Sequence, residues 1–363
     1  MGESIPAARL AAMSLDARGD LVRLFRDVVD IESVSGNETE LADAVHAVLA
    51  DAPHLTVDRD GDTIVARTNL GRPTRVVIAG HLDTVPLANN LPSWVEGENI
   101  YGRGTCDMKG GVAVALAAAV ELAAPRHDVT WIFYDHEEVE AAKNALGRVA
   151  RTHPEWLVGD FAVLMEPTSA RIEGGCQGTL RFTVATQGVA AHSARGWLGH
   201  NAIHDLAEPL ARLAAYQPRT VEVEGLTFRE GLNAVAISGG IAGNVIPDAG
   251  ALVVNFRFAP DRDEANAKDH CRAVFEGYDL AFTDFAPAAR PGLDLPAARE
   301  FVDAVGGTPS AKFGWTDVAR FAELGIPAVN FGPADPGKAH ADDEFCPVAD
   351  LFACRDALVR WLS

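Results

Sequence analysis

The sequence predicts an α/β protein with a mixed, largely parallel sheet, interrupted by a smaller inserted α+β domain. Two patterns predict this fold class. Short apolar runs alternate with helical stretches in the first part of the chain, and a different order of strands and helices begins near Gly178 and ends before Pro296. The length of 363 residues is a third observation, because a single hydrophobic core usually stops growing below that size. Two domains are therefore expected.

The first part of the chain alternates helices with short apolar strands. Two helical stretches open it, LVRLFRDVVDI and ETELADAVHAVLA. Strands are expected at TIVART, RVVIAG, VTWIFYD and FAVLME, with an Ala-rich helix from Gly111 and a further helical segment between them. This alternation is typical of a largely parallel sheet that is covered by helices.

The middle of the chain has a different order of elements. A strand, TLRFTVATQG, precedes a helix near residues 201–215, and the strands GLNAVAISGGIAG and ALVVNFRFAP precede another helix and the strand YDLAFTDFAP. This is the order of a ferredoxin-like α+β unit. A helix and the buried strand PAVNFGP then resume the first pattern. The expected division is a large domain of residues 1–177 and 291–363 with a small domain, residues 178–290, inserted into it.

The charge balance and the apolar runs exclude two kinds of partner. The chain has 31 Lys and Arg against 51 Asp and Glu, a formal net charge of −20, which repels phosphate backbones. Nucleic acid is therefore not an expected partner, although a local basic pocket could still bind a small anion. The longest apolar run, GVAVALAAAVELAA, is too short to span a bilayer, so no membrane association is expected.

The cysteines and the first residues predict a location. The five cysteines are scattered without any C-x-x-C pair, which fits neither a disulfide framework nor a structural zinc knuckle. The opening stretch MGESIPAARLAAMSLDARGD carries acidic residues and no apolar block of the signal-peptide type. The sequence therefore predicts an untargeted, cytoplasmic protein.

Polar side chains follow four of the predicted strands. The strands RVVIAG, VTWIFYD, FAVLM and PAVNFGP lead to His81, Asp83, Glu137, Glu138, Glu166 and His340. A fifth polar cluster places Asp107 in the Gly-rich stretch GRGTCDMKGG, just before a helix. Because ligands bind beyond the carboxyl ends of strands in open α/β sheets, these distant side chains are expected to converge.

The residue types of this set favour a metal site. Imidazoles and carboxylates without a thiolate suit zinc or cobalt, and one bridging carboxylate would allow the two-metal arrangement of hydrolytic sites. Asp83 could accept the other N–H of the His81 ring and fix its tautomer. Each residue alone has a simpler interpretation: His81 as a core histidine, Asp107 as a turn residue, Glu166 as a strand-end carboxylate, His340 as a loop histidine. Their joint placement at strand ends favours the metal site.

Seven motifs occur in an order that resembles a known enzyme family. They are GHLDTVP, GRGTCDMKGG, the EE pair, MEPTS, GVAAHSARG, GNVIPD and AHADDE. From about Ile31 to its C-terminal end, the chain resembles the two-zinc deacylases and exopeptidases that include carboxypeptidase G, aminoacylase and acetylornithine deacetylase. Longer stretches such as EGGCQGTLRFTV and FGWTDVARF are most similar to the branch that removes succinate from N-succinyl-LL-2,6-diaminopimelate, a reaction of lysine and cell-wall precursor synthesis.

The resemblance implies a zinc-exopeptidase-like catalytic domain that holds two Zn²⁺ per subunit, for which Co²⁺ can substitute. Asp107 would bridge the two ions, and the other ligands would be His81 and Glu166 for one ion, Glu138 and His340 for the second. Asp83 would orient His81. Glu137 would be the general base that takes a proton from the attacking water.

The resemblance also makes the inserted domain a lid through which two subunits form a homodimer. His192 would then polarise the scissile carbonyl in the active site of the partner subunit, Asn244 would act there as well, and Arg257 would meet a carboxylate of a small anionic N-acyl amino acid. The chain departs from well-known desuccinylases at GCQGT, where they have GRRGS. Other basic residues are therefore alternative carboxylate partners: Arg181, Arg195, Lys312 and Lys338.

The sequence leaves three alternatives open. The protein could be another N-acyl amino acid deacylase or a dipeptidase with the same metal chemistry. A non-catalytic binding protein on the same fold is less favoured, because such a protein has no need of a base at Glu137. His136, between the strand VTWIFYD and the two glutamates, is assigned a structural role only.

Overall fold

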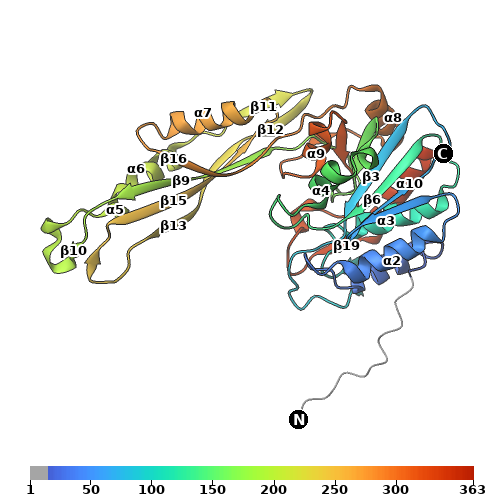
Figure 1. Cartoon of the computed structure of the whole chain (residues 1–363), viewed down its shortest axis with the longest axis horizontal. Helices are drawn as coiled ribbons and strands as arrows, with labels where there is room; N and C mark the ends of the chain where they lie inside the picture. The colour runs from blue at the N-terminus through green and yellow to red at the C-terminus, as the bar shows by residue number, and fades with distance from the viewer. Residues whose placement is uncertain (1–14) are drawn as a thin grey trace, which may run out of the picture. The chain divides into compact units, whose positions relative to one another are not determined.

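The computed structural model describes residues 15–363, which divide into two compact units. Unit 1 contains the described chain up to Glu173, together with Gly292–Pro309 and Arg320–Ser363, and unit 2 contains Gly174–Pro291 and Ser310–Ala319 (Figure 1). Most of the opening stretch that predicted no signal peptide lies outside the described residues.

The division places one segment differently from the sequence-based expectation. Ser310–Ala319 groups with unit 2, whereas the sequence pattern assigned it to the large domain. The reason is a set of long-range contacts: β17 (Ser310–Ala311) contacts β12 (Leu226–Arg229), and the Lys312 N–H donates to the Gly174 carbonyl at 3.4 Å. An apolar pattern along the chain does not specify which partner a two-residue strand will choose.

Unit 1 is built on a mixed sheet whose first six strands follow the order β1-β2-β6-β3-β7-β18. Their bounds are β1 (Thr56–Asp60), β2 (Thr63–Arg67), β3 (Arg75–His81), β6 (Asp128–Tyr134), β7 (Phe161–Leu164) and β18 (Ala328–Asn330). The pairs β3·β6, β3·β7 and β7·β18 are parallel, whereas β1·β2 and β2·β6 are antiparallel. The predicted mixed, largely parallel sheet is confirmed.

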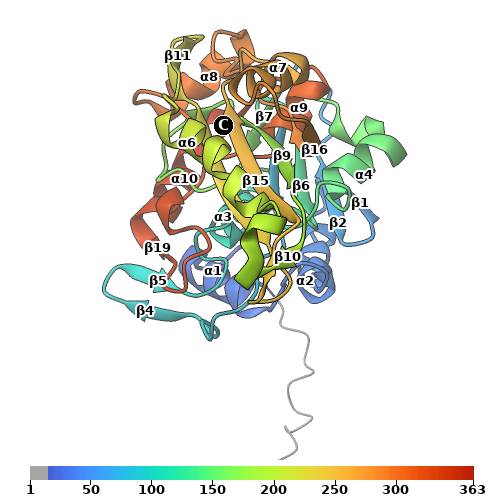
Figure 2. The same cartoon turned by 90° about the vertical axis from the view of Figure 1, so that its left-hand side faces the viewer.

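Helices cover both faces of this sheet. The helices of the described chain are α1 (Leu21–Asp30), α2 (Thr39–Ala50), α3 (Lys109–Glu121), α4 (Ala145–Thr152), α5 (Ala202–Asp205), α6 (Ala207–Ala215), α7 (Glu264–Val274), α8 (Pro296–Val305), α9 (Val318–Glu323) and α10 (Val348–Leu362). The Ala-rich helix α3 is buried from Lys109 to Val120 and packs against α1, α2, α10 and β3. Helix α4 lies on the opposite face of the sheet from α3 (Figures 1 and 2). Strand β6 is buried at every residue, because it lies inside the sheet and helices cover both faces.

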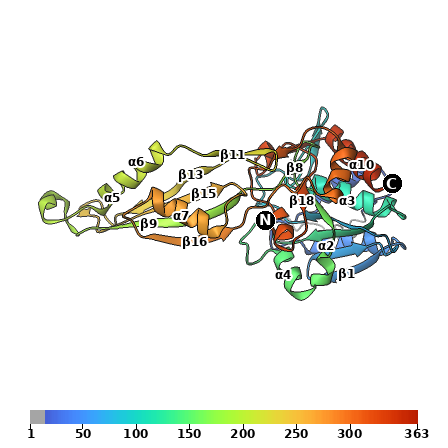
Figure 3. The same ribbon diagram turned by 90° about the horizontal axis from the view of Figure 1, so that it is seen from above.

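Unit 2 is built on a four-stranded antiparallel sheet with the order β13-β15-β9-β16. The strands are β9 (Gly178–Gln187), β13 (Gly231–Gly239), β15 (Ala249–Phe258) and β16 (Leu280–Ala286). Helices α5, α6 and α7 lie along the same face of this sheet (Figures 1 and 3). Side chains alternate along β9, so that Phe182 is buried in the core of unit 2 while Arg181 is exposed. The order of strands and helices is the predicted ferredoxin-like order.

Three small sheets accompany the two main ones, and the sequence pattern did not predict them. They are β10 (Ala191–His192) with β14 (Val245–Ile246), β11 (Thr220–Val223) with β12 (Leu226–Arg229), and β19 (Phe345–Pro347) with β5 (Asn99–Tyr101) and β4 (Trp94–Glu96). All five cysteines are buried and free. Within residues 15–363, no helix combines the length and the apolar character that crossing a membrane requires.

Candidate metal centre

The polar clusters of unit 1 meet at one edge of its sheet. His81 is the last residue of β3, Glu137 and Glu138 follow β6, and Glu166 follows β7. Because β3, β6 and β7 are parallel neighbours, their carboxyl ends lie at the same edge. The order β6-β3-β7 also places consecutive strands on opposite sides of β3, the point at which open α/β sheets form their binding crevice.

Two groups of side chains at this edge have the spacing of metal ligands. His81, Asp107 and Glu166 form one group and Asp107, Glu138 and His340 form the other, with the candidate ligand atoms of each group within 4.8 Å of one another. The structure thus brings together all five residues that the sequence analysis named as metal ligands. Glu137 belongs to neither group.

The two carboxylate oxygens of Asp107 face different histidines. Its Oδ1 lies 3.2 Å from Nε2 of His81, and its Oδ2 lies 3.4 Å from Nε2 of His340. The same His340 nitrogen is 3.0 Å from Oε1 of Glu138. One carboxylate therefore presents a separate oxygen to each imidazole, and the nitrogen and oxygen donors fit zinc or a similar divalent ion.

The charges of the site favour protonated imidazoles until a metal ion replaces the protons. Hydrogen bonds with Asp107 and Glu138 raise the pKa of His340 to about 10. Burial alone would lower the pKa of His81, but contacts with Asp107 and Asp83 outweigh it and hold that pKa well above its usual value. Burial likewise opposes ionisation of Asp107, yet the two histidines hold its pKa well below the usual range. Metal binding here would release protons.

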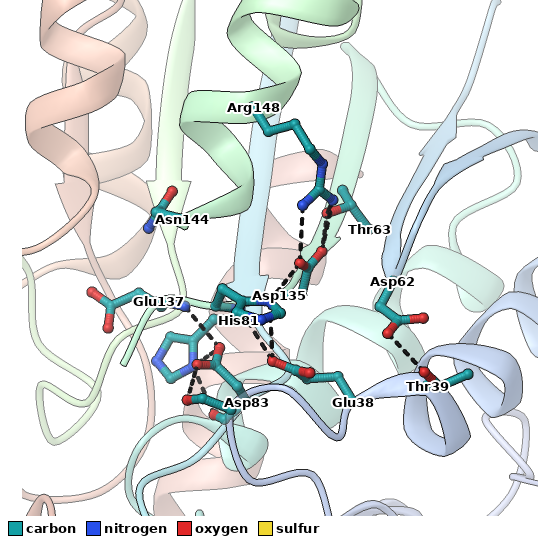
Figure 4. Close-up of polar contacts among 12 residues, drawn as sticks. Glu38, Thr39, Asp62, Thr63, His81, Asp83, Asp135, Glu137, Asn144 and Arg148 are labelled. Atoms are coloured by element: carbon teal, nitrogen blue, oxygen red, sulfur yellow. Dashed lines mark hydrogen bonds and ion pairs between the residues drawn. The ribbon is translucent and has the colours of Figure 1, made fainter. Parts of the chain in front are cut away.

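Asp83 connects His81 to the turn that carries both glutamates (Figure 4). The Nδ1 atom of His81 is 2.9 Å from the backbone oxygen of Asp83 and 3.5 Å from its carboxylate. The carboxylate instead accepts hydrogen bonds from the backbone N–H groups of Glu137 (2.9 Å) and Glu138 (3.0 Å) and from the Ser35 hydroxyl (2.6 Å). Burial would raise the pKa of Asp83, but these bonds and His81 lower it to about 2. The sequence analysis expected the Asp83 carboxylate to contact the His81 ring, but the backbone oxygen of Asp83 is closer to it.

The Gly-rich turn that holds Asp107 is fixed from two sides. The Lys109 ammonium is buried and donates to the backbone oxygens of Ile31 (2.6 Å) and Val29 (3.3 Å) at the end of α1. A Cβ on Gly111 would lie 2.1 Å from the backbone oxygen of Met165, so only glycine lets α3 approach the strand end that leads to Glu166.

A buried ion pair that the sequence analysis missed joins the two loops of the second ligand group. Arg103 donates to the Glu344 carboxylate and to the Ala341 backbone oxygen, each at 3.1 Å. The Gly104 N–H also donates to Glu344. Burial raises the pKa of Glu344 to about 7. Both residues occur inside the motifs GRGTCD and AHADDE, but the sequence pattern gave no sign that they are buried together.

The other predicted site residues lie in unit 2. His192 is in β10 and Asn244 precedes β14, and the N–H of Ser193 donates to the Asn244 backbone oxygen at 2.9 Å, so the two residues are neighbours. Arg257 lies in β15, and its side chain makes no hydrogen bond or ion pair with any residue of the described chain. Burial, together with the nearby Arg181, lowers its pKa.

Comparisons with known proteins agree on one family. The chain matches the family described as Peptidase family M20/M25/M40 over residues 77–363. It is 53% identical over 352 residues to the putative succinyl-diaminopimelate desuccinylase DapE of Mycobacterium tuberculosis, covering 96% of this chain and 99% of that protein. It is 47% identical over 360 residues to the succinyl-diaminopimelate desuccinylase of Corynebacterium glutamicum, covering 96% and 98%.

A solved structure is similar in fold. It is the Bacillus subtilis YXEP protein, described as a dinuclear metal binding peptidase from the M20 family. The two chains superpose with a TM-score of 0.69 at 17% sequence identity, covering 94% of this chain and 96% of that one. This likeness supports the fold described above.

Proposed function

The chain belongs to peptidase family M20/M25/M40, and we propose that it is a metal-dependent amidohydrolase that cleaves N-succinyl-LL-2,6-diaminopimelate to succinate and LL-2,6-diaminopimelate. The observation that carries the chemistry is the Asp107 carboxylate, whose two oxygens face two different histidines. The desuccinylase relatives, similar over nearly the whole chain, support the substrate. The reaction belongs to the synthesis of lysine and cell-wall precursors.

Two Zn²⁺ ions per subunit, with Co²⁺ as a substitute, are the proposed cofactors. Asp107 would contact both ions, and the remaining ligands would be His81, Glu166, Glu138 and His340. When bound, such a pair of ions polarises the amide carbonyl and makes a shared water more acidic.

Glu137 is the proposed general base. Its neighbour Glu138 lies in a ligand group and contacts His340, whereas Glu137 lies in neither group. The Glu137 side chain points away from the cluster formed by Asp135 and Arg148 (Figure 4). A carboxylate placed beside the attacking water can accept its proton and then deliver a proton to the leaving amine.

Unit 2 carries the residues that are proposed to bind a substrate carboxylate. The guanidinium of Arg257 is a planar fork that suits a bidentate grip on a substrate carboxylate, and it has no anionic partner in the described chain. Arg181 pairs with Asn255 across β9 and β15, which places it diagonally next to Arg257 on the same face of the sheet. Arg181 is therefore a second candidate for binding the anionic substrate.

A homodimer is part of the proposal, because His192 and Asn244 would act in the active site of the partner subunit. Strand β13 is the outer strand of its sheet, and it exposes Val235 and Ile237, each 57% accessible. An apolar outer strand is a surface on which a second copy can pair. A cytoplasmic location also remains a proposal, and the five buried thiols are compatible with a reducing compartment.

A panel of substrates tests the function. The zinc-loaded protein should release succinate and diaminopimelate from the N-succinyl compound faster than it hydrolyses N-acetyl amino acids or dipeptides. Turnover of another N-acyl amino acid without turnover of the succinyl compound would favour the related deacylase or dipeptidase. An absence of turnover on the whole panel, with two metal ions bound, would support the binding-protein alternative.

A further inference from the structure

The turn after β6 contains a histidine whose role the proposed chemistry leaves open. His136 has a backbone φ of +61°, the left-handed conformation. Histidine is among the residues enriched in this conformation. Even so, a non-glycine residue held there costs on the order of 1–3 kcal/mol and persists only where the surrounding structure fixes it. The residues that contact this turn should therefore explain how the conformation of His136 is held.

Two buried carboxylates hold three consecutive backbone N–H groups of this turn. The N–H of His136 donates to Oε1 of Glu38 at 3.3 Å. The next two N–H groups, of Glu137 and Glu138, donate to the two oxygens of Asp83 at 2.9 and 3.0 Å. Glu38 is 1% exposed and Asp83 is not exposed at all. The backbone that carries the proposed base and a proposed metal ligand is thus held from behind at every residue.

The ring of His136 also contacts the Glu38 carboxylate, which already accepts the backbone N–H of the same residue. Its Nδ1 is 2.8 Å from Oδ2 of Asp135 and 3.4 Å from Oε1 of Glu38. Because ionised carboxylates only accept hydrogen bonds, Nδ1 must carry a proton to satisfy them. The ring therefore links the end of β6 to the residue that precedes α2.

Asp135 is itself fixed by residues from two further elements (Figure 4). Arg148 of α4 donates to both of its oxygens, at 3.1 and 2.9 Å, and the Thr63 hydroxyl of β2 donates at 2.6 Å. Glu38 has fewer side-chain partners, since no side chain in the described part of the chain donates to its Oε2. The contacts that this buried carboxylate makes with a distant segment are those with the N–H and the ring of His136.

We propose that Glu38 and His136 are positioning residues that hold the turn of residues 136–138, so that Glu138 points to the metal centre and Glu137 to the reacting water. This inference rests on the proposed function, because it takes Glu137 as the base. Both residues act through the backbone that presents the two glutamates.

The test compares Glu38→Ala with Glu38→Gln. The alanine variant removes the acceptor of the His136 N–H, so kcat should fall roughly 10–100-fold while KM stays within about 2-fold, since a small misplacement of a reacting group has such an effect. The bound metal should remain at two ions. The amide hydrogens of residues 136–138 should exchange faster with solvent. The glutamine variant keeps an accepting oxygen and should restore most of kcat and of the exchange protection.

A matched control separates positioning from general stability. Glu230 of unit 2 is also buried (2% exposed), and its carboxylate accepts hydrogen bonds from Arg219 and Arg262. Glu230→Ala should lower stability without changing exchange at residues 136–138 or the ratio of kcat to metal content. If Glu38→Ala does not fold, His136→Asn replaces it, because asparagine also accepts the left-handed backbone but is too short to bridge the two carboxylates.

Several outcomes would overturn the inference. One is unchanged amide exchange at residues 136–138 in Glu38→Ala or His136→Asn. Another is an unchanged kcat in these variants. A third is that Glu230→Ala changes exchange and kcat as much as Glu38→Ala does. The exchange and metal measurements need no substrate. Failure of the native protein to hydrolyse the succinyl compound would therefore count against the proposed function, while the exchange result would still decide whether Glu38 and His136 fix the turn.

Discussion

At the scale of single residues, the clearest feature is the different environment of two adjacent glutamates. Glu138 contacts His340 and belongs to a ligand group, while Glu137 does not. The left-handed residue His136 precedes them, and Asp83 holds the N–H of each. The Asp83 carboxylate thus holds the N–H groups of both glutamates, whose side chains have different surroundings.

This difference predicts the effect of replacing the base. Glu137→Gln should lower kcat by about 10²–10⁴-fold, the usual contribution of a general base, while two metal ions still bind. Glu138→Gln is the matched control, because the same change one residue later should lower the metal content instead. Turnover and metal content would be measured on the same preparations. Near-normal activity of Glu137→Gln would remove the assignment.

At the scale of elements, the buried pair of Arg103 and Glu344 fastens the Asp107 turn to the loop that holds His340. The pKa of Glu344 is raised by burial to about 7 from a usual value of 4.5. The folded protein therefore binds more protons than the unfolded chain between these two pH values. The contribution of Glu344 to stability is largest below pH 4.5 and is lost as the pH rises through about 7.

Glu344→Gln should remove this dependence on pH. The experiment compares the unfolding free energies of the metal-free variant and the metal-free native protein. The value of the variant minus that of the native protein should increase from pH 5 to pH 8, by about 3 kcal/mol at most. Glu121→Gln, at an exposed position, should show no such trend. Chemical denaturation at several pH values measures both. A constant difference across this range would contradict the assignment of the titration to Glu344.

The close approach of α3 to the end of β7 gives a second prediction at this scale. Gly111→Ala should destabilise the protein by roughly 1–3 kcal/mol and lower metal content, because the new methyl group would meet the backbone oxygen of Met165. Gly243→Ala is the control, since a Cβ there would meet nothing within 4 Å. Thermal unfolding and metal analysis would compare the two variants. Equal stabilities of the two variants would show that the close approach of Gly111 to Met165 does not require glycine.

At the scale of the whole molecule, the proposed site combines residues of two subunits. If His192 acts in the partner subunit, His192→Ala and Glu137→Gln should each be nearly inactive alone, yet a mixture should regain activity. Random pairing gives one intact site in each mixed dimer, hence roughly a quarter of the native activity. A mixture of Glu137→Gln with Glu138→Gln should regain none, since each change would disable the site of the subunit that carries it and no intact site could form. No recovery in the first mixture would count against a site shared between subunits.

The sequence by itself determined the sheet, the inserted unit and the five candidate metal ligands. These follow from local signals: apolar runs mark buried strands, and the carboxyl ends of parallel strands meet at one edge, so polar residues just beyond them converge. Ordered motifs then indicated the family. The local sequence pattern is enough to place a residue when that residue directly follows a recognisable strand.

Only the tertiary structure decided which residues stand behind these ligands. Glu38 and His136 are 98 residues apart, and Arg103 and Glu344 are 241 residues apart, yet each pair meets in a buried contact. The placement of Ser310–Ala319 in unit 2 likewise depends on contacts with distant segments of that unit. A charged residue looks the same in the sequence whether it faces water or a buried partner, because its environment is set by packing between distant segments.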